Sequence, residues 1–155
     1  MNWTTFGIGL VTSLIGSFGF ALIFRLRTRY LIPASFGGLV AFAVYFVCDT
    51  FGMGLFIANL LAALVGSLYS ELLARVMRTP TVEFMIPCLI PLVPGGMLYY
   101  AMSSLLASDY DAGFTNLKNA LMTALGIAAG VIAVSLIFAL WTGIVKNIKK
   151  RRSPS

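Results

Sequence analysis

The 155-residue sequence contains no histidine and very little charge. Only five residues are acidic, and charged residues make up 10% of the chain, against about 25% in soluble domains. The lack of histidine removes the usual general base, the commonest metal ligand and the ordinary switch near neutral pH. Because polar loops hold no clustered carboxylates either, we find no nucleophile–base pair. The sequence therefore argues against an enzyme, and we expect no metal and no cofactor.

Cysteine is also scarce, and both copies, Cys48 and Cys88, lie in apolar runs. They are typical of small buried residues and not of a disulfide-bonded secreted domain. Apolar side chains are abundant: 59% of the residues are hydrophobic and the mean hydropathy is +0.95. A chain of this length buries only about 68–70% of its surface by folding alone. We therefore predict an all-α integral membrane protein, surrounded by lipid.

Apolar stretches of about 20 residues, long enough to cross a bilayer, occur five times. They cover residues 3–24, 30–48, 52–73, 84–107 and 117–145. Residues 108–116 are expected to form a polar loop that holds Asp109 and Asp111. We predict one membrane domain of five helices over residues 1–145, a basic cytoplasmic tail over 146–155, and no cleaved signal peptide.

Positive charge is distributed unevenly between the ends of these spans. If the N-terminus lies outside, all basic residues except Lys118 fall on the inner side. They are Arg25, Arg27, Arg29, Arg75, Arg78, Lys146, Lys149, Lys150, Arg151 and Arg152. Since short cytoplasmic loops collect lysine and arginine, we expect a plasma-membrane protein with its N-terminus outside and its C-terminus in the cytoplasm. The net charge of +6 is then an orientation signal and does not indicate a nucleic-acid partner.

The fourth apolar stretch contains a cluster of helix-breaking residues. Pro87, Pro91 and Pro94 each lack an amide donor and clash with the preceding turn. Gly95 and Gly96 follow directly. We predict an unwound segment, which survives in hydrocarbon only when it is buried in protein or lines a wet cavity. Transporters use such breaks to present backbone groups to substrates; a plain proline kink that shapes packing is the alternative.

The same stretch resembles the signature of the threonine/serine exporter family, in its small-subunit type, which is equivalent to the C-terminal half of the fused exporters. The matching residues are Ile86-Pro87, Ile90-Pro91-Leu92-Val93-Pro94-Gly95-Gly96 and Leu98-Tyr99, preceded by Ser70-Glu71, Ala74-Arg75 and Pro80. Cys88 departs from the pattern, which has a small residue such as glycine there. The resemblance implies proton-driven efflux of threonine and serine, or of dicarboxylates such as succinate in some split members. It also implies a larger membrane subunit as partner.

Residues around the break are the first candidates for a substrate site. The hypothesis is alternating access around Pro91, Pro94, Gly95 and Gly96, whose backbone groups would hold the ammonium and carboxylate of a zwitterion. Tyr99 follows the break and either offers its hydroxyl to the site or anchors the chain at the membrane interface.

Isolated polar and charged residues within the spans are further candidates. Asn59 lies in an apolar run and needs a hydrogen-bond partner, either another helix or a substrate. Glu71 and Arg75 are four residues apart on one helix, so they can pair. They form either a structural ion pair or part of a gate or proton relay. Glu83 either caps its helix or takes part in gating the transport path. Asp49 is either a turn residue or part of the exit.

Small residues recur along the first and last spans and predict close contacts between helices. They are Gly7, Gly9, Ser13, Gly16 and Gly19, and then Gly126, Gly130, Ala133 and Ser135. The contacts are either within the chain or at a seam with another copy or with the larger subunit. Beside the exporter, two functions stay open: a non-transporting scaffold subunit and a passive channel.

Overall fold

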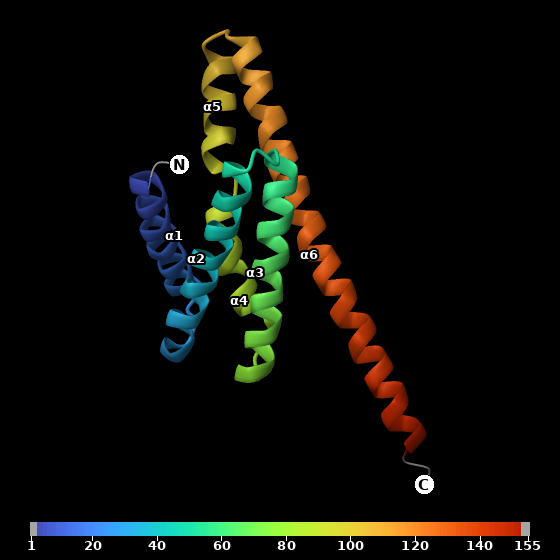
Figure 1. Ribbon diagram of the computed structural model, residues 1–155. Coiled ribbons are helices and arrows are strands. Elements are labelled where there is room, and N and C mark those ends of the chain that lie inside the picture. Colours follow the sequence, from blue (N-terminus) through green and yellow to red (C-terminus); the bar gives the residue numbers. More distant parts are fainter. Residues whose placement is uncertain (1–2, 153–155) are drawn as a thin grey trace.

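The computed structural model describes the backbone of residues 3–152 and the side chains of residues 4–142. The described part is helical, as predicted, and its elements are α1 (Trp3–Ile23), α2 (Thr28–Thr50), α3 (Leu55–Met77), α4 (Thr81–Leu89), the 3-10 turn η1 (Ile90–Leu92), α5 (Gly95–Leu106) and α6 (Tyr110–Arg152). Successive spans run in opposite directions, so α1 begins and α6 ends on opposite sides of the bundle (Figure 1).

Four helices, α1, α2, α3 and α6, are long and apolar enough to cross a membrane. The fifth crossing is the bent pair formed by α4 with η1 and by α5, whose two halves meet at an angle of 49°. Counted in this way, the described chain has the five predicted spans, with the fourth one broken. The first half of the pair packs against α2 and α3, whereas α5 packs against α6.

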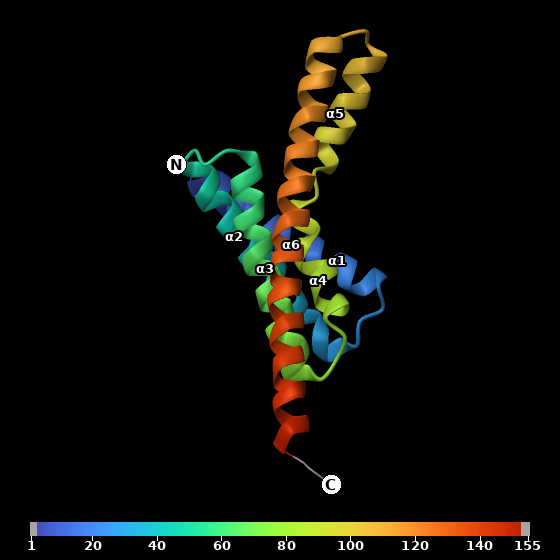
Figure 2. The ribbon, with the colours of Figure 1, turned by 90° about the vertical axis from the view of Figure 1, so that its right-hand side faces the viewer.

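The helix α6 begins earlier than the sequence predicts. We expected a polar loop over residues 108–116, but the helix starts at Tyr110. The backbone N–H of Ala112 donates to the Asp109 carboxylate at 3.1 Å, and an aspartate just before a helix stabilises its start. The loop prediction was wrong because polar residues are tolerated on a helix that stands clear of the apolar bundle. Figure 2 shows α5 and the start of α6 extending beyond the ends of α1, α2 and α3.

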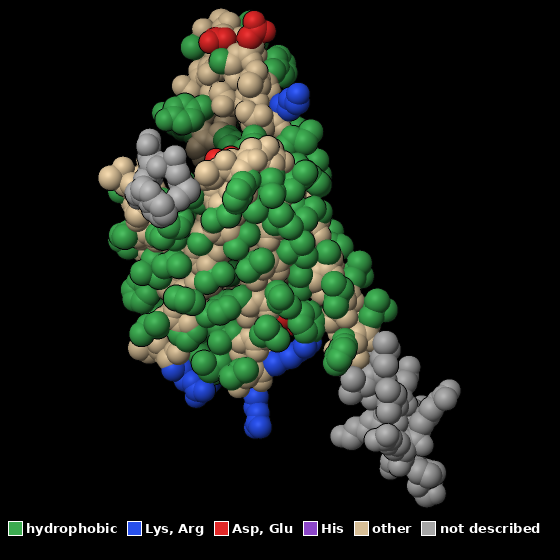
Figure 3. Space-filling model, in the orientation of Figure 1, with side chains coloured by type: hydrophobic (Ala, Val, Ile, Leu, Met, Phe, Trp, Pro, Cys, Tyr) green, Lys and Arg blue, Asp and Glu red, His purple; other side chains and the backbone are tan. Residues whose placement is uncertain are grey.

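Small side chains form the interior of the bundle, and large apolar side chains cover its outside. The fully buried residues include Ala34, Ala41 and Ala62, whereas Ile, Leu, Phe and Val side chains are exposed along every span. Figure 3 shows this apolar outer surface. Such an arrangement suits a lipid solvent, since lipid gives no hydrophobic drive to bury large side chains and close packing favours small ones. Both cysteines are buried free thiols.

Two glycines of α6 allow it to pack closely on α3. A Cβ added to Gly126 would lie 2.5 Å from the carbonyl oxygen of Phe56, and one added to Gly130 would lie 2.7 Å from that of Leu60. These two glycines therefore act within the chain and not at a seam. In α1, by contrast, Gly16 has no neighbouring atom within 4 Å of an added Cβ.

Charge separates between the two ends of the molecule. The described arginines lie where α1 meets α2 and where α3 meets α4, and the acidic residues Asp109 and Asp111 lie at the far tip between α5 and α6 (Figure 3). The side chains of the basic residues after Val145 lie outside the described part of the chain. The expected tail and the orientation of the chain therefore stay predictions.

Candidate functional site

The break in the fourth span is narrower than the sequence predicts. Pro87 lies inside α4 and Pro91 lies inside η1, while Gly95 and Gly96 form the first turn of α5. Between the start of α4 and the end of α5, only residues 93 and 94 lie outside a helix. A proline fixes φ near −65°, which is a helical value. Prolines can therefore remove hydrogen bonds from a helix without unwinding it when neighbouring helices hold it.

The break leaves the carbonyl oxygen of Pro91 without its usual backbone donors. Pro94, three residues on, has no N–H. The N–H of Gly95, four residues on, donates instead to the carbonyl of Val93 at 2.8 Å. This oxygen is therefore available to a ligand.

The break also exposes backbone N–H groups at the start of α5. The N–H of Gly95 bonds to Val93, and the N–H of Leu98 bonds to the carbonyl of Pro94 at 3.1 Å. Between them, the N–H groups of Gly96 and Met97 belong to the first turn, which has no acceptor within the helix. The positive end of the α5 dipole lies at the same place, so the start of α5 is suited to a negatively charged group.

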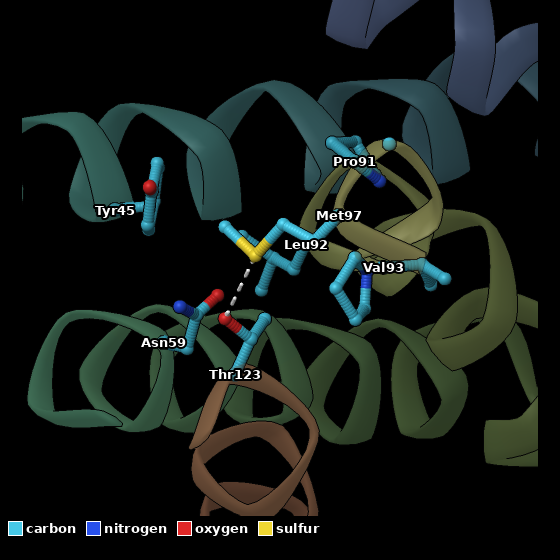
Figure 4. Close-up of a pocket in the computed structure, with 9 residues that line it drawn as sticks. Tyr45, Asn59, Pro91, Leu92, Val93, Met97 and Thr123 are labelled. Atoms are coloured by element: carbon cyan, nitrogen blue, oxygen red, sulfur yellow. Dashed lines mark hydrogen bonds between the residues drawn. The ribbon is translucent and has the colours of Figure 1, made fainter. Parts of the chain in front are cut away.

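A cavity of about 230 Å³ lies beside the break. Three helices contribute polar side chains to it: Tyr45 from α2, Asn59 from α3 and Thr123 from α6 (Figure 4). Its other lining residues are Pro91, Leu92, Val93, Pro94, Gly96 and Met97. None of the lining residues carries a charge, so the cavity is neutral and mainly apolar, with three polar side chains.

Asn59 presents a hydrogen-bond acceptor to this cavity. The residue is only 2% exposed, and its Nδ2 donates to the carbonyl of Leu55 on its own helix at 2.7 Å. Its side-chain oxygen lies on the side of Met97 and Thr123 (Figure 4). The Thr123 hydroxyl is 3.9 Å from the Met97 sulfur, a weak contact. The Asn59 side-chain oxygen and the Thr123 hydroxyl can therefore form hydrogen bonds with a polar ligand in the cavity.

The structure brings Pro91, Pro94, Gly96 and Asn59 together at one cavity, but it leaves two candidates of the break outside it. Gly95 does not line the cavity. Tyr99 is 67% exposed and its ring contacts the ring of Tyr100, with centroids 5.5 Å apart.

None of the charged candidates lines the cavity, but Asp49 lies one helical turn after Tyr45 on α2. Glu71 and Arg75 pair at 3.6 Å, and the Arg75 guanidinium lies 4.0 Å from the ring centroid of Phe138 on α6. This contact joins α3 to α6 at the basic end of the bundle. Glu83 lies in the first turn of α4, and Asp49 is exposed near the end of α2.

Tyr45 and Thr123 were missed by the sequence reasoning, although one signal was present for Thr123. It is a polar residue in an apolar run, and it precedes Gly126 by three residues, so the two share a helix face. Tyr45 carries no comparable signal, because tyrosine is common in apolar spans near their ends.

A family model described as "Threonine/Serine exporter, ThrE" matches residues 9–137, more than three quarters of the chain. The chain belongs to the threonine/serine exporter family. Comparison with curated proteins and with solved structures gives no match. The family is one of membrane exporters, so the chain has an exporter-type transport role, and its long apolar helices fit a multi-pass membrane protein. All residues that line the cavity fall within the matched region.

Proposed function

We propose that this chain exports a small zwitterionic amino acid, threonine or serine, through the cavity at the α4–α5 break. The observation that carries the proposal is the convergence of complementary neutral groups in one place. An amide oxygen, two hydroxyls, a free carbonyl and free N–H groups meet beside a lining that has no charged residue. A ligand with one positive and one negative group, and no net charge, matches this set.

The ends of the amino acid have distinct places in the proposed complex. The carboxylate accepts hydrogen bonds from the N–H groups of Gly96 and Met97 at the positive end of α5. The ammonium donates to the Asn59 side-chain oxygen and to the Pro91 carbonyl. The substrate hydroxyl lies toward Thr123. A dicarboxylate such as succinate would need positive partners for two carboxylates, and the lining offers none.

The coupling proton needs a group that the cavity does not contain. None of the carboxylates that the structure describes lines it. We therefore assign proton binding either to Glu71, at the basic end of α3, or to a carboxylate of the larger membrane subunit. In this scheme the N-terminus lies outside the plasma membrane. The cavity opens alternately to the two sides as α4 and α5 move about residues 93 and 94.

In this proposal the larger subunit packs against the side of α5 that faces away from α6. The helix packs on α6 and makes at most marginal contact with the other helices described. A Cβ added at Gly95 or Gly96 would meet nothing within 4 Å. The space beside these two glycines is open within this chain, and we propose that substrate or the larger subunit occupies it.

The experiment measures threonine, serine and succinate efflux from loaded cells that lack their own exporters. The chain is expressed alone and with a candidate larger subunit, with a protonophore control. We expect threonine and serine efflux only on co-expression, and its loss with the protonophore. Gradient-insensitive flux from the chain alone would instead identify a channel. No flux, with both proteins present in the membrane, would favour a scaffold.

Asn59→Ala tests the site within that assay. Removing one acceptor from a charged group costs about 1.5–3 kcal/mol, so we expect threonine efflux to fall roughly 10- to 100-fold. Asn116→Ala is the matched control, because Asn116 makes the same kind of bond to its own helix, from Nδ2 to the Ala112 carbonyl at 3.0 Å, outside the cavity. The double variant Gly95→Val/Gly96→Val should also abolish efflux while the chain still assembles. Normal efflux in both variants would show that the substrate site does not lie at the break.

A further inference from the structure

A second hollow lies on the outer surface, between α1 and α2. It has a volume of about 410 Å³ and is lined by Leu14, Ile15, Phe18, Ile32, Ser35, Phe36 and Leu39. The Ser35 hydroxyl donates to the carbonyl of Leu31 in its own helix at 2.7 Å. The groove therefore offers apolar surface and no free polar side chain.

Both walls of this groove lead to an arginine at the basic end of the molecule. On α2, Arg29, Ile32 and Phe36 follow one another at intervals of three and four residues, so they share one face of the helix. On α1, Phe18 is followed seven residues later by Arg25, just past the end of the helix. At a rise of about 1.5 Å per residue, Arg29 lies about 5 Å along α2 from Ile32, and Arg25 lies in the turn directly after α1.

The arginines beside the groove have no internal counterion. Among the described side chains the ion pair found is Glu71–Arg75, on α3. Arg25 and Arg27 are exposed, and the Arg29 guanidinium lies 5.0 Å from the ring centroid of Tyr30. Figure 3 shows blue side chains directly below the green surface of α1 and α2. An apolar groove thus ends at unpaired positive charge.

We propose that the α1–α2 groove binds an anionic phospholipid, with one acyl chain in the groove and the phosphate held by Arg25 and Arg29, the arginines at the ends of its two walls. An acyl chain gains no hydrophobic free energy by leaving the bilayer for a protein groove, so selectivity has to come from the headgroup. Basic residues between helices at a membrane surface are suited to anionic headgroups. The proposal does not depend on the transport function.

A second copy of the chain is a poorer occupant than a lipid. A two-fold contact within a membrane places the same patch of both copies together. The arginines of one copy would then face those of the other, and no described carboxylate of their own chain lies within ion-pair distance of them. The α3–α6 groove, by contrast, is apolar, but the nearby Arg75 is already paired with Glu71. We expect no headgroup selectivity at that second groove.

The test measures lipid binding to the purified full-length chain by native mass spectrometry. Phosphatidylglycerol is compared with phosphatidylcholine that has the same acyl chains. Each basic residue near a membrane surface contributes about fivefold in binding, so Arg25→Gln should weaken phosphatidylglycerol about fivefold and leave phosphatidylcholine unchanged. Arg78→Gln is the control, because Arg78 lies at the same basic end and shares the positive φ of Arg25, 55° against 53°.

A groove variant separates the acyl chain from the headgroup. Ile32→Trp fills the groove and should reduce phosphatidylglycerol binding, whereas Val76→Trp on α3 should not; the two residues are 77% and 78% exposed. Equal binding of the two lipids, or equal loss in Arg25→Gln and Arg78→Gln, would overturn the proposal. So would a change of oligomeric state in Ile32→Trp without loss of lipid, which would assign the groove to a protein neighbour.

Discussion

The close contact between α3 and α6 at Gly126 holds the cavity together, and a single methyl group tests it. In Gly126→Ala the new Cβ would lie 2.5 Å from the Phe56 carbonyl oxygen and 3.2 Å from the Cβ of Asn59. The first of these atoms belongs to backbone, so the two helices have to separate. Overpacking of this kind costs about 1–3 kcal/mol.

Alanine in a helix regains about 0.5–1 kcal/mol relative to glycine. The expected net effect of Gly126→Ala is therefore a loss of roughly 1 kcal/mol of stability, and about 2.5 kcal/mol at most. Gly16→Ala is the matched control. It has the same propensity gain and no neighbouring atom within 4 Å, so we expect it to be stabilised by about 0.5–1 kcal/mol. The two variants should shift stability in opposite directions.

The assay is reversible unfolding in mixed micelles by titration with sodium dodecyl sulfate, paired with amino-acid efflux from cells. Gly130→Ala separates packing from the site. Its Cβ would also approach backbone, at 2.7 Å from the Leu60 carbonyl, but Asn59 is not among its nearest neighbours. We expect similar stability in Gly126→Ala and Gly130→Ala and lower efflux in the first. A Gly126→Ala protein as stable as Gly16→Ala would refute the α3–α6 contact.

Two further substitutions test individual hydrogen bonds, each with a matched control. Tyr69→Phe removes the hydrogen bond that the Tyr69 hydroxyl donates to the Pro33 carbonyl at 2.8 Å, which joins α3 to α2. In the same unfolding assay it should lower stability by about 0.5–1.5 kcal/mol. The control Tyr99→Phe should leave stability unchanged. Asp109→Ala removes the carboxylate at the start of α6 and should cost about 1 kcal/mol, and a larger effect of Asp111→Ala would contradict this assignment.

The number of spans and the place of the break could be predicted from the sequence because both depend on local properties. An apolar run of about 20 residues specifies a span by its length alone, and Pro91, Pro94 and Gly95 weaken a helix wherever they occur. The width of the break could not be predicted. It depends on how firmly α2 and α3 hold the α4 backbone around Pro87, which is a tertiary property.

The partners of the break were harder to predict for a different reason. In a soluble helix the apolar stripe shows which face is buried. Here apolar residues cover all faces, because lipid and protein interior are similar solvents. The faces of α2 and α6 that carry Tyr45 and Thr123 therefore look like any other face in the sequence. Asn59 was found only because an amide in an apolar run is costly without a partner.

The length of α6 has a mechanical consequence. Its 43 residues extend over about 65 Å, roughly twice the hydrocarbon thickness of a bilayer, without a kink-forming proline. It packs on α3 from Gly126 to Phe138, and this stretch acts as the support. The part toward Tyr110 is about 24 Å long and the part toward Arg152 about 21 Å. A small rotation about the supported stretch would displace the two ends in opposite directions, so α6 can transmit motion between the two membrane surfaces.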